Sequence, residues 1–144
     1  MTYLPTEMIE HILKFSNSST LHKCLEIPYL AEIVQPILDK RYQHCLKILI
    51  KYGFAIDETY AKKQLNSGEI YMWSTNITDT NLTTLTYYCH NLTKIYLEGS
   101  EKITDISIKK ILHNCPKLKE IYLSYTNITE QTKQLLRNKS IEVY

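Results

Sequence analysis

Cysteine and histidine are the side chains of this chain best suited to bind a metal ion. Two groups of them are dense enough to consider, namely Cys89, His90, His113 and Cys115, and the pair His44 and Cys45. No Cys-x-x-Cys spacing accompanies either group, although this spacing is the strong signature of a zinc site. We therefore expect free thiols that pack as small hydrophobic side chains, with no metal and no other cofactor.

Nucleophilic and phosphate-transfer chemistry has no motif in the sequence. None of the five histidines stands at a spacing typical of a nucleophile and its base, and no glycine-rich phosphate loop occurs among only three glycines. Each histidine fits a surface or loop position. The chain is therefore predicted not to be an enzyme, and binding is the function class that the sequence favours.

The composition describes an ordinary soluble surface. The chain has 144 residues, a formal net charge of +2 and 22% charged residues, which fits one domain or two small ones. Without a basic stripe, nucleic acid is not an expected partner. No apolar run reaches about 18 residues and the N-terminus lacks a signal-peptide pattern, so we expect no membrane contact and an intracellular location, in the cytoplasm or the nucleus. Twelve tyrosines and three glycines are typical of an AT-rich coding genome, such as that of a large DNA virus or a protist.

The cysteines at positions 89 and 115 belong to a sequence repeat. Ile-Thr-Asp or Ile-Thr-Glu occurs at residues 77–79, 103–105 and 128–130. Ile-Tyr followed by Met or Leu occurs at residues 70–72, 95–97 and 121–123. The offsets are 25 or 26 residues, a period typical of chains that stack one supersecondary unit on the next.

Each repeat predicts one short strand, a tight loop and one helix. Apolar residues three and four positions apart predict helices at 79–89 and 105–114, and a threonine precedes each Asp or Glu, as at a helix N-cap. The fold class is therefore α/β, with parallel strands expected at 70–72, 95–97 and 121–123 and a candidate fourth strand at 141–143. The predicted buried side chains are Leu92, Ile95, Leu97, Leu118, Ile121 and Leu123.

The residues between the buried strand positions form a candidate recognition face. Strand alternation places them on the side away from the core, and they are Tyr71, Trp73, Lys94, Tyr96, Glu98, Glu120 and Tyr122. Tyrosine and tryptophan offer large contact area and few rotatable bonds, so they are frequent in binding hot spots. The alternative is that tyrosine recurs here only because it suits strands.

The repeat resembles the cysteine-containing subclass of leucine-rich repeats. Cys89-x-x-Leu92-x-x-Ile95-x-Leu97 is followed by Ile103-Thr104-Asp105, and Cys115 begins a second copy of the same pattern. The family's second Cys or Asn is replaced by Thr75, Ser100 and Thr126. The resemblance implies a short solenoid over residues 51–144, with two full and two partial repeats and one helix in each.

The first fifty residues read as helical. Pro5 and Glu7 are typical of a helix start, and Asn17 to Thr20 separate this helix from a second one beginning near Leu21. Residues 29–52 form a longer helix that Pro36 should kink or divide and Gly53 should end. A further helix is predicted at 57–65. The bland interpretation is a helical hairpin that caps the stacked units.

Residues 4–27 also resemble an F-box. The matching residues are Leu4, Pro5, Glu7, Met8, Ile9, Ile12, Leu13, Leu21, Cys24 and Ile27. Pro28 and Tyr29 stand where the family tends to place a basic residue and a Trp. The resemblance divides the chain into an F-box-like domain, 1–50, and a repeat domain, 51–144.

The two resemblances together imply a function. An F-box docks a Skp-family adaptor of a cullin complex, and the repeats hold the target protein for ubiquitin transfer. The implied adaptor contacts are Leu4, Pro5, Ile9, Ile12 and Leu13. The alternatives are a plain leucine-rich-repeat interaction module and a decoy that occupies the adaptor without delivering a target.

Overall fold

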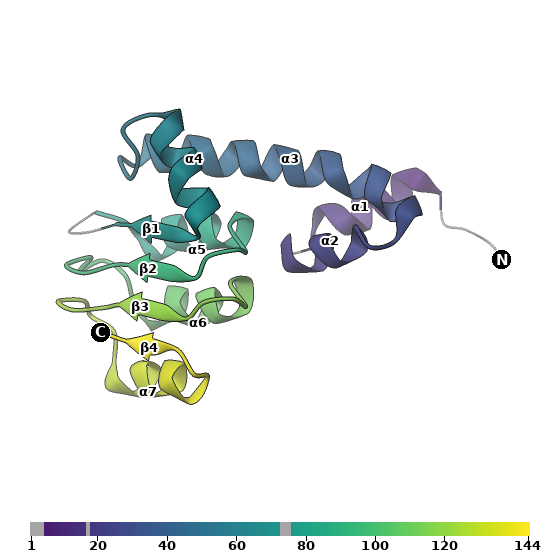
Figure 1. Ribbon diagram of the computed structural model, residues 1–144. Helices are drawn as coiled ribbons and strands as arrows, with labels where there is room; N and C mark the ends of the chain where they lie inside the picture. Colours follow the sequence, from purple (N-terminus) through teal and green to yellow (C-terminus); the bar gives the residue numbers. More distant parts are fainter. Residues whose placement is uncertain (1–4, 17, 73–75) are drawn as a thin grey trace.

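The computed structural model describes residues 5–16, 18–72 and 76–144. Within them lie seven helices and one four-stranded parallel sheet (Figure 1). The N-terminal helices lie beside and above the sheet, and the remaining helices alternate with its strands along the chain. The helices are α1 (Thr6–Lys14), α2 (Ser18–Cys24), α3 (Pro28–Lys51), α4 (Glu58–Ser67), α5 (Asp79–Tyr88), α6 (Asp105–Asn114) and α7 (Glu130–Asn138).

The sheet follows the chain order without crossing. Its strands are β1 (Glu69–Tyr71), β2 (Lys94–Tyr96), β3 (Glu120–Tyr122) and β4 (Glu142–Val143). Ile70 pairs with Ile95, Ile95 with Ile121, and Ile121 with Val143, all in parallel. The register therefore matches the predicted 25- and 26-residue offsets, and the predicted fourth strand is present.

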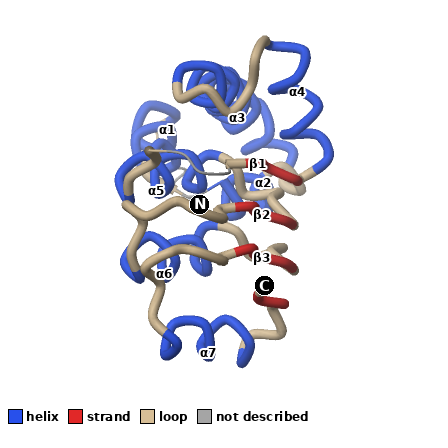
Figure 2. Tube along the Cα trace, turned by 90° about the vertical axis from the view of Figure 1, so that its left-hand side faces the viewer, coloured by secondary structure: helices blue, strands red, loops and turns tan. Residues whose placement is uncertain are grey.

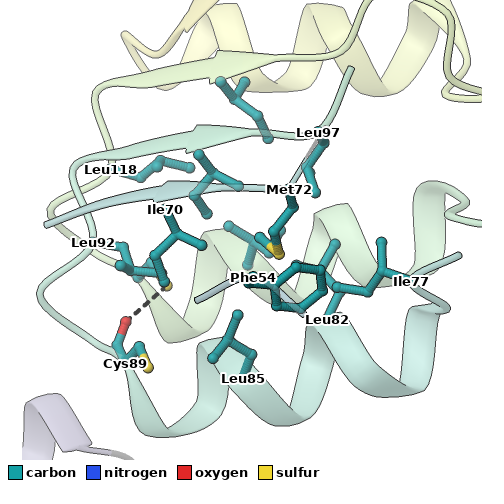
Figure 3. Packing of buried hydrophobic residues seen from close by; sticks show 14 of the residues in the cluster. Phe54, Ile70, Met72, Ile77, Leu82, Leu85, Cys89, Leu92, Leu97 and Leu118 are labelled. Atoms are coloured by element: carbon teal, nitrogen blue, oxygen red, sulfur yellow. Dashed lines mark hydrogen bonds between the residues drawn. The ribbon is translucent and has the colours of Figure 1, made fainter. Parts of the chain in front are cut away.

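Alternation along each strand divides the sheet into a buried and an open side. Helices α5 and α6 lie on one side, while no helix of the described chain covers β2 and β3 on the other (Figures 1 and 2). Toward the helices, strand and helix side chains meet in one cluster (Figure 3). All six side chains predicted as core are buried there. Leu97 is fully buried and Tyr96 only partly, so the predicted register is confirmed.

Successive units are linked through the Thr-Asp pair of the repeated motif. The Asp79 carboxylate accepts hydrogen bonds from the backbone N–H and the hydroxyl of Thr104, at 2.8 and 2.5 Å, and from the Ser107 hydroxyl at 2.6 Å. Asp105 accepts the same two bonds from Thr129. Each carboxylate therefore accepts from the backbone N–H of the N-cap residue of the next helix. That N–H group has no carbonyl partner within its own helix.

The loops between strand and helix use hydroxyl groups where the resembled family uses Cys or Asn. The buried Ser100 hydroxyl donates to the Met72 carbonyl at 3.0 Å, and Thr126 donates to the Leu123 carbonyl at 2.6 Å. Thr75 lies outside the described residues. A hydroxyl therefore satisfies a loop carbonyl in two successive units.

Helix α3 is one continuous element that belongs to both parts of the molecule. Its first half contributes Val34 and Leu38 to a small cluster with α1 and α2, and its second half contributes Leu46 and Leu49 to the sheet core. Pro36 was expected to kink or divide this helix, but α3 runs through it unbroken. The lost backbone donor is tolerated because both halves are held by buried side chains on either side of the proline. Helix α3 therefore connects the helical segment to the sheet, and the predicted division at residue 50 falls near its C-terminal end.

Glycines follow the C-terminal ends of α3 and α4, and the one after α3, Gly53, was predicted from the sequence. Helix α3 ends at Lys51, and Gly53 follows with a φ of +75°. Helix α4 begins after Asp57, whose carboxylate accepts from the Tyr60 N–H, and ends at Gly68 with a φ of +73°. A Cβ at Gly68 would also lie 2.9 Å from the Asn91 carbonyl oxygen. Gly68 therefore lets the chain turn directly from α4 into β1 beside the neighbouring unit.

Candidate functional site

Four tyrosines stack across the open side of the sheet. We call Tyr71, Tyr96, Tyr122 and Tyr144 the tyrosine ladder. Their successive ring centroids are 4.4, 4.3 and 4.6 Å apart, with interplanar angles of 14–15°. The parallel register places equivalent residues beside one another, so one repeated strand position becomes a continuous column. Tyr144 was not predicted as part of this column.

A charged column runs beside the tyrosine ladder, two residues earlier on each strand. It consists of Glu69, Lys94, Glu120 and Glu142, and we call it the carboxylate column. The Lys94 ammonium group lies 3.8 Å from Glu69 and 3.1 Å from Glu120. Its pKa is raised, first by the hydrogen bond to Glu120 and then by the charge of that carboxylate. Lys94 therefore remains protonated between two acids at neutral pH.

The tyrosine hydroxyls turn back to the carboxylate column. Tyr71 donates to Glu69 at 2.9 Å, Tyr122 to Glu120 at 3.1 Å and Tyr144 to Glu142 at 2.5 Å. The bond to Glu69, with desolvation, raises the pKa of Tyr71 to about 12. Desolvation and the bond to Glu120 also raise the pKa of Tyr122. The hydroxyls of Tyr71 and Tyr122 therefore stay neutral donors at neutral pH.

The structure brings together nearly all of the predicted recognition residues. Tyr71, Lys94, Tyr96, Glu120 and Tyr122 share the open side of the sheet, each partly buried by its neighbours. Glu98 is also partly buried and continues the outward positions beyond β2. Trp73 lies outside the described residues. The described part of this face is therefore a surface of partly buried aromatic and charged side chains.

A second candidate surface lies on α1. Met8, Ile12 and Phe15 are 50%, 54% and 70% exposed, and Pro5 is exposed at the start of the helix. Spacings of three and four residues place these four on one side of the helix. We call them the apolar stripe. Phe15 also borders a groove of about 900 Å³ between α1 and α3. Exposed apolar residues that lie together are typical of protein-binding sites.

The predicted adaptor-binding residues differ in their exposure. Pro5 and Ile12 are exposed as that role requires. Leu13 is only 8% exposed because it packs into the small cluster with Leu21 and α3, so this arrangement leaves little of its side chain open to a partner, and its contact with the adaptor stays a prediction. Ile9 packs partly against the same cluster. Leu4 lies outside the described residues.

Two exposed residues of the apolar stripe were not among the predicted adaptor contacts. These are Met8 and Phe15, although Met8 belongs to the matched pattern. The packing of Leu13, and partly of Ile9, against α2 and α3 sets the side of α1 that faces inward. Helical spacing then places Met8 and Phe15 on the outward side. Family position alone does not give that orientation.

The candidate metal-binding residues scatter or are used in packing. Burial raises the pKa of the Cys89 thiol, whose sulfur lies 2.6 Å from that of Cys45. Burial also lowers the pKa of His90 to about 4, and its ring stacks on His22 with centroids 3.9 Å apart. Within the described ranges, no three His, Cys, Asp or Glu side chains gather as a metal site would require.

Cys115 contacts the equivalent cysteine of the preceding repeat. Its thiol donates a hydrogen bond to the Cys89 carbonyl oxygen at 3.4 Å. Burial raises the pKa of this thiol. Cys89 and Cys115 therefore behave as neighbouring packed thiols, as their equivalent repeat positions predicted.

Helix length and hydropathy bear on membrane contact. In the part of the chain that the structure describes, none of the helices is both long and apolar enough to cross a bilayer. The longest, α3, carries charged residues in both of its halves.

Comparisons with known proteins assign no family to these surfaces. The chain matches no protein-family model, no curated protein and no solved structure. A function for the apolar stripe and the tyrosine ladder therefore has to come from their own geometry and chemistry.

Proposed function

We propose that the protein is the substrate-recognition subunit of an SCF-type ubiquitin ligase. In this proposal α1 and its neighbours act as an F-box that binds a Skp-family adaptor of a cullin complex. The sheet with its helices acts as a short leucine-rich-repeat solenoid that holds a target protein. The chain performs no chemistry of its own, because bringing a target near a ubiquitin-loaded enzyme is sufficient. Such a protein would work in the cytoplasm or the nucleus.

The apolar stripe is the observation that carries the adaptor-binding half of the proposal. One side of α1 packs through Leu13 into the helical cluster, while the opposite side leaves Met8, Ile12 and Phe15 in solvent. Full burial of a large apolar side chain is worth about 1.5–3 kcal/mol. Met8, Ile12 and Phe15 forgo this stabilisation in the free chain, and a partner that covers them would supply it.

The ordering of the units supports the repeat half of the proposal. Strands β1 to β4 pair strictly in sequence order at offsets near 25 residues. Each unit places one helix behind the sheet and the same tyrosine in front. A sheet built this way presents one repeated side-chain position as a continuous face that could bind a partner. Packing of the core does not require the same side chain at each outward position.

Capping of the sheet core by the helical segment favours the second candidate, an interaction module without a ubiquitin role. Leu46, Leu49, Phe54 and Ala61 bury in the same cluster as Ile70 of the first strand. They come from α3, α4 and the loop between these helices, and the apolar stripe on α1 takes no part in this contact. The surface that caps the sheet core and the proposed adaptor-binding surface are therefore different. A cap alone does not need the exposed apolar stripe, whereas adaptor binding does.

The proposal is tested by co-purification from cells with a paired exposed-isoleucine control. Met8→Asp with Ile12→Asp places charge on the stripe, whereas Ile106→Asp places it on an isoleucine of α6 that is 63% exposed. The stripe variant should lose the Skp-family adaptor and the Ile106 variant should keep it. Adaptor recovery by the stripe variant equal to that of the parent chain would refute the F-box assignment. Ubiquitin transfer to a captured target then separates a working receptor from a decoy.

The tyrosine ladder is tested by removing its rings. Tyr71→Ala, Tyr96→Ala and Tyr122→Ala together should abolish target capture while adaptor binding persists. Tyrosine-to-phenylalanine changes at the same three positions keep the stacked rings and serve as the control. Full target capture by the alanine variant would move recognition away from the ladder.

A further inference from the structure

The open side of the sheet has a charge opposite to that of the whole chain. The chain carries a formal net charge of +2. The outward positions of the strands and of the extension after β2 carry four carboxylates, Glu69, Glu98, Glu120 and Glu142, and one ammonium group, Lys94. The surface around the tyrosine ladder is therefore acidic, and a partner that covers it needs compensating positive charge.

The rings and carboxylates present different chemistry to such a partner. The tyrosine rings are nearly parallel and about 4.5 Å apart, so their faces lie against one another and their edges face solvent. A cation therefore gains little from the ring faces. Glu69, Glu120 and Glu142 each accept a hydroxyl from the tyrosine two residues later on the same strand. An ionised carboxylate offers about four acceptor sites, so each keeps capacity for a donor from a partner.

Lys94 competes for those acceptors from inside the protein. Its ammonium group reaches both Glu69 and Glu120. Glu142 stands one strand beyond Glu120 and has no ion pair with any described residue within 4.0 Å. The carboxylate column therefore holds one internal cation for three carboxylates. A cation from a partner could pair with a carboxylate that Lys94 does not neutralise.

We propose that the tyrosine ladder and the carboxylate column bind a basic segment of a partner protein. Its arginine or lysine heads pair with the carboxylates, and its aliphatic stems lie along the tyrosine ring edges. Arginine suits the site best because its planar fork can donate two hydrogen bonds to one carboxylate. The inference rests on the proposed target-binding role of the ladder and specifies the chemistry of the target.

The location of Lys94 makes a prediction that a neutral or acidic partner would not. Lys94→Gln removes the internal competitor and frees Glu69 and Glu120, so affinity for a basic segment should rise. An exposed ion pair is worth roughly 0.2–1 kcal/mol, so we expect tightening of about 1.4- to five-fold. Glu120→Gln should weaken binding by about the same factor, and replacing Glu69, Glu120 and Glu142 together by Gln should weaken it further.

The test uses the full chain and three fluorescent peptides of equal length. One has Arg at alternate positions separated by Ser, and the others replace every Arg by citrulline or by Glu. Fluorescence anisotropy measures each affinity at low and high salt for the parent chain and its variants. Lys110→Gln on α6, an exposed lysine on the helix side of the sheet, is the control for net charge. Circular dichroism checks that every variant is folded.

The proposal is supported if the chain binds the Arg peptide in preference to the other two. This binding should be tightened by Lys94→Gln, weakened by the Glu→Gln changes and by salt, and unaffected by Lys110→Gln. Equal binding of the citrulline peptide, stronger binding of the Glu peptide, or no effect of Lys94→Gln overturns it. Adaptor binding is measured on the same preparations through α1. A chain that binds the adaptor but not the Arg peptide refutes this inference and leaves the adaptor role standing.

Discussion

The helical segment and the stacked strand–helix units treat their apolar side chains in opposite ways. Around α1 and α2 only Leu13, Leu21, Val34 and Leu38 form a buried cluster, while the apolar stripe lies exposed. The stacked units bury nearly every repeated Ile and Leu and leave tyrosines and charges outside. The helical segment therefore exposes large apolar side chains, whereas the sheet buries its apolar side chains in the core and presents tyrosines and charged groups at its surface.

Under the proposed function, this difference predicts two kinds of recognition. An apolar stripe suits a permanent or tight partner that completes a hydrophobic core. A half-buried ladder of tyrosines and carboxylates suits a more selective contact, since charged and polar groups contribute specificity more than affinity. The two surfaces lie on separate elements, so one can be altered without the other.

The largest effect is expected in the core of the stacked units. Leu97→Ala should lower the free energy of unfolding by about 2–5 kcal/mol, because Leu97 is fully buried and its truncation leaves a cavity. Urea unfolding followed by circular dichroism measures the loss. A loss below about 1 kcal/mol would mean that the core does not depend on this column.

The next effect concerns the joint between the two regions. The buried Arg41 donates to the Lys14 carbonyl at 3.0 Å and to the Tyr87 hydroxyl at 3.3 Å, and Tyr87 donates to the Phe15 carbonyl at 3.2 Å. Arg41→Met keeps the aliphatic stem but removes the charged donor, at an expected cost of about 1.5–3 kcal/mol. Hydrogen exchange should increase in α1 far more than in α6. Equal increases in both helices would show that Arg41 does not join the regions locally.

A smaller effect compares equivalent positions within the repeat. Asp79→Ala should cost about 1–3 kcal/mol because the Thr104 backbone N–H and two hydroxyls lose their acceptor. Glu130 occupies the third copy but pairs with Arg137 in its own helix and reaches no later unit. Glu130→Ala should therefore leave thermal stability nearly unchanged. Similar losses for both variants would remove the inter-unit role of the motif.

The same carboxylates predict a pH dependence. Desolvation raises the pKa of Asp79, but hydrogen bonds from Ser107 and Thr104 outweigh it, so the pKa is lowered overall. The pKa of Asp105 is lowered in the same way through Thr129. Stabilisation from a lowered carboxyl pKa is present above the unfolded value of about 3.9 and is lost as pH falls through the folded value. Asp79→Asn should flatten the decline of stability in acid, and an unchanged acid profile would contradict this assignment.

The repeats made the register of the sheet predictable, because a period of 25 or 26 sets which side chains stack. Each of the first three strands begins and ends one residue earlier than predicted, and the fourth begins one residue later. The buried Leu97 and the partly buried Tyr96 followed from alternation along the strand. The Asp79–Thr104 link could not be read from one unit, since it joins side chains 25 residues apart. The sequence of each motif identified the threonine that caps the helix, but not the aspartate of the preceding unit that binds this threonine.

The helical segment was harder to predict because no repeat sets its helical phase. The pattern through residues 4–13 placed Ile9, Ile12 and Leu13 together, but only the packing against α3 decides that Leu13 turns inward and Ile12 outward. The continuity of α3 through Pro36 also depends on tertiary packing, which overrides the local preference to break there. Sequence pattern thus located helix α1 but not its exposed side.

The most direct measurement of the central claim is the affinity of the purified chain for a purified Skp-family adaptor, by isothermal titration calorimetry. The parent chain and the Ile106→Asp control should bind alike, because Ile106 lies on α6 away from the apolar stripe. Met8→Asp with Ile12→Asp should bind at least about tenfold more weakly, since charge would enter an apolar contact worth more than 1.4 kcal/mol. No binding by the parent chain, or equal binding by all three proteins, would contradict the account.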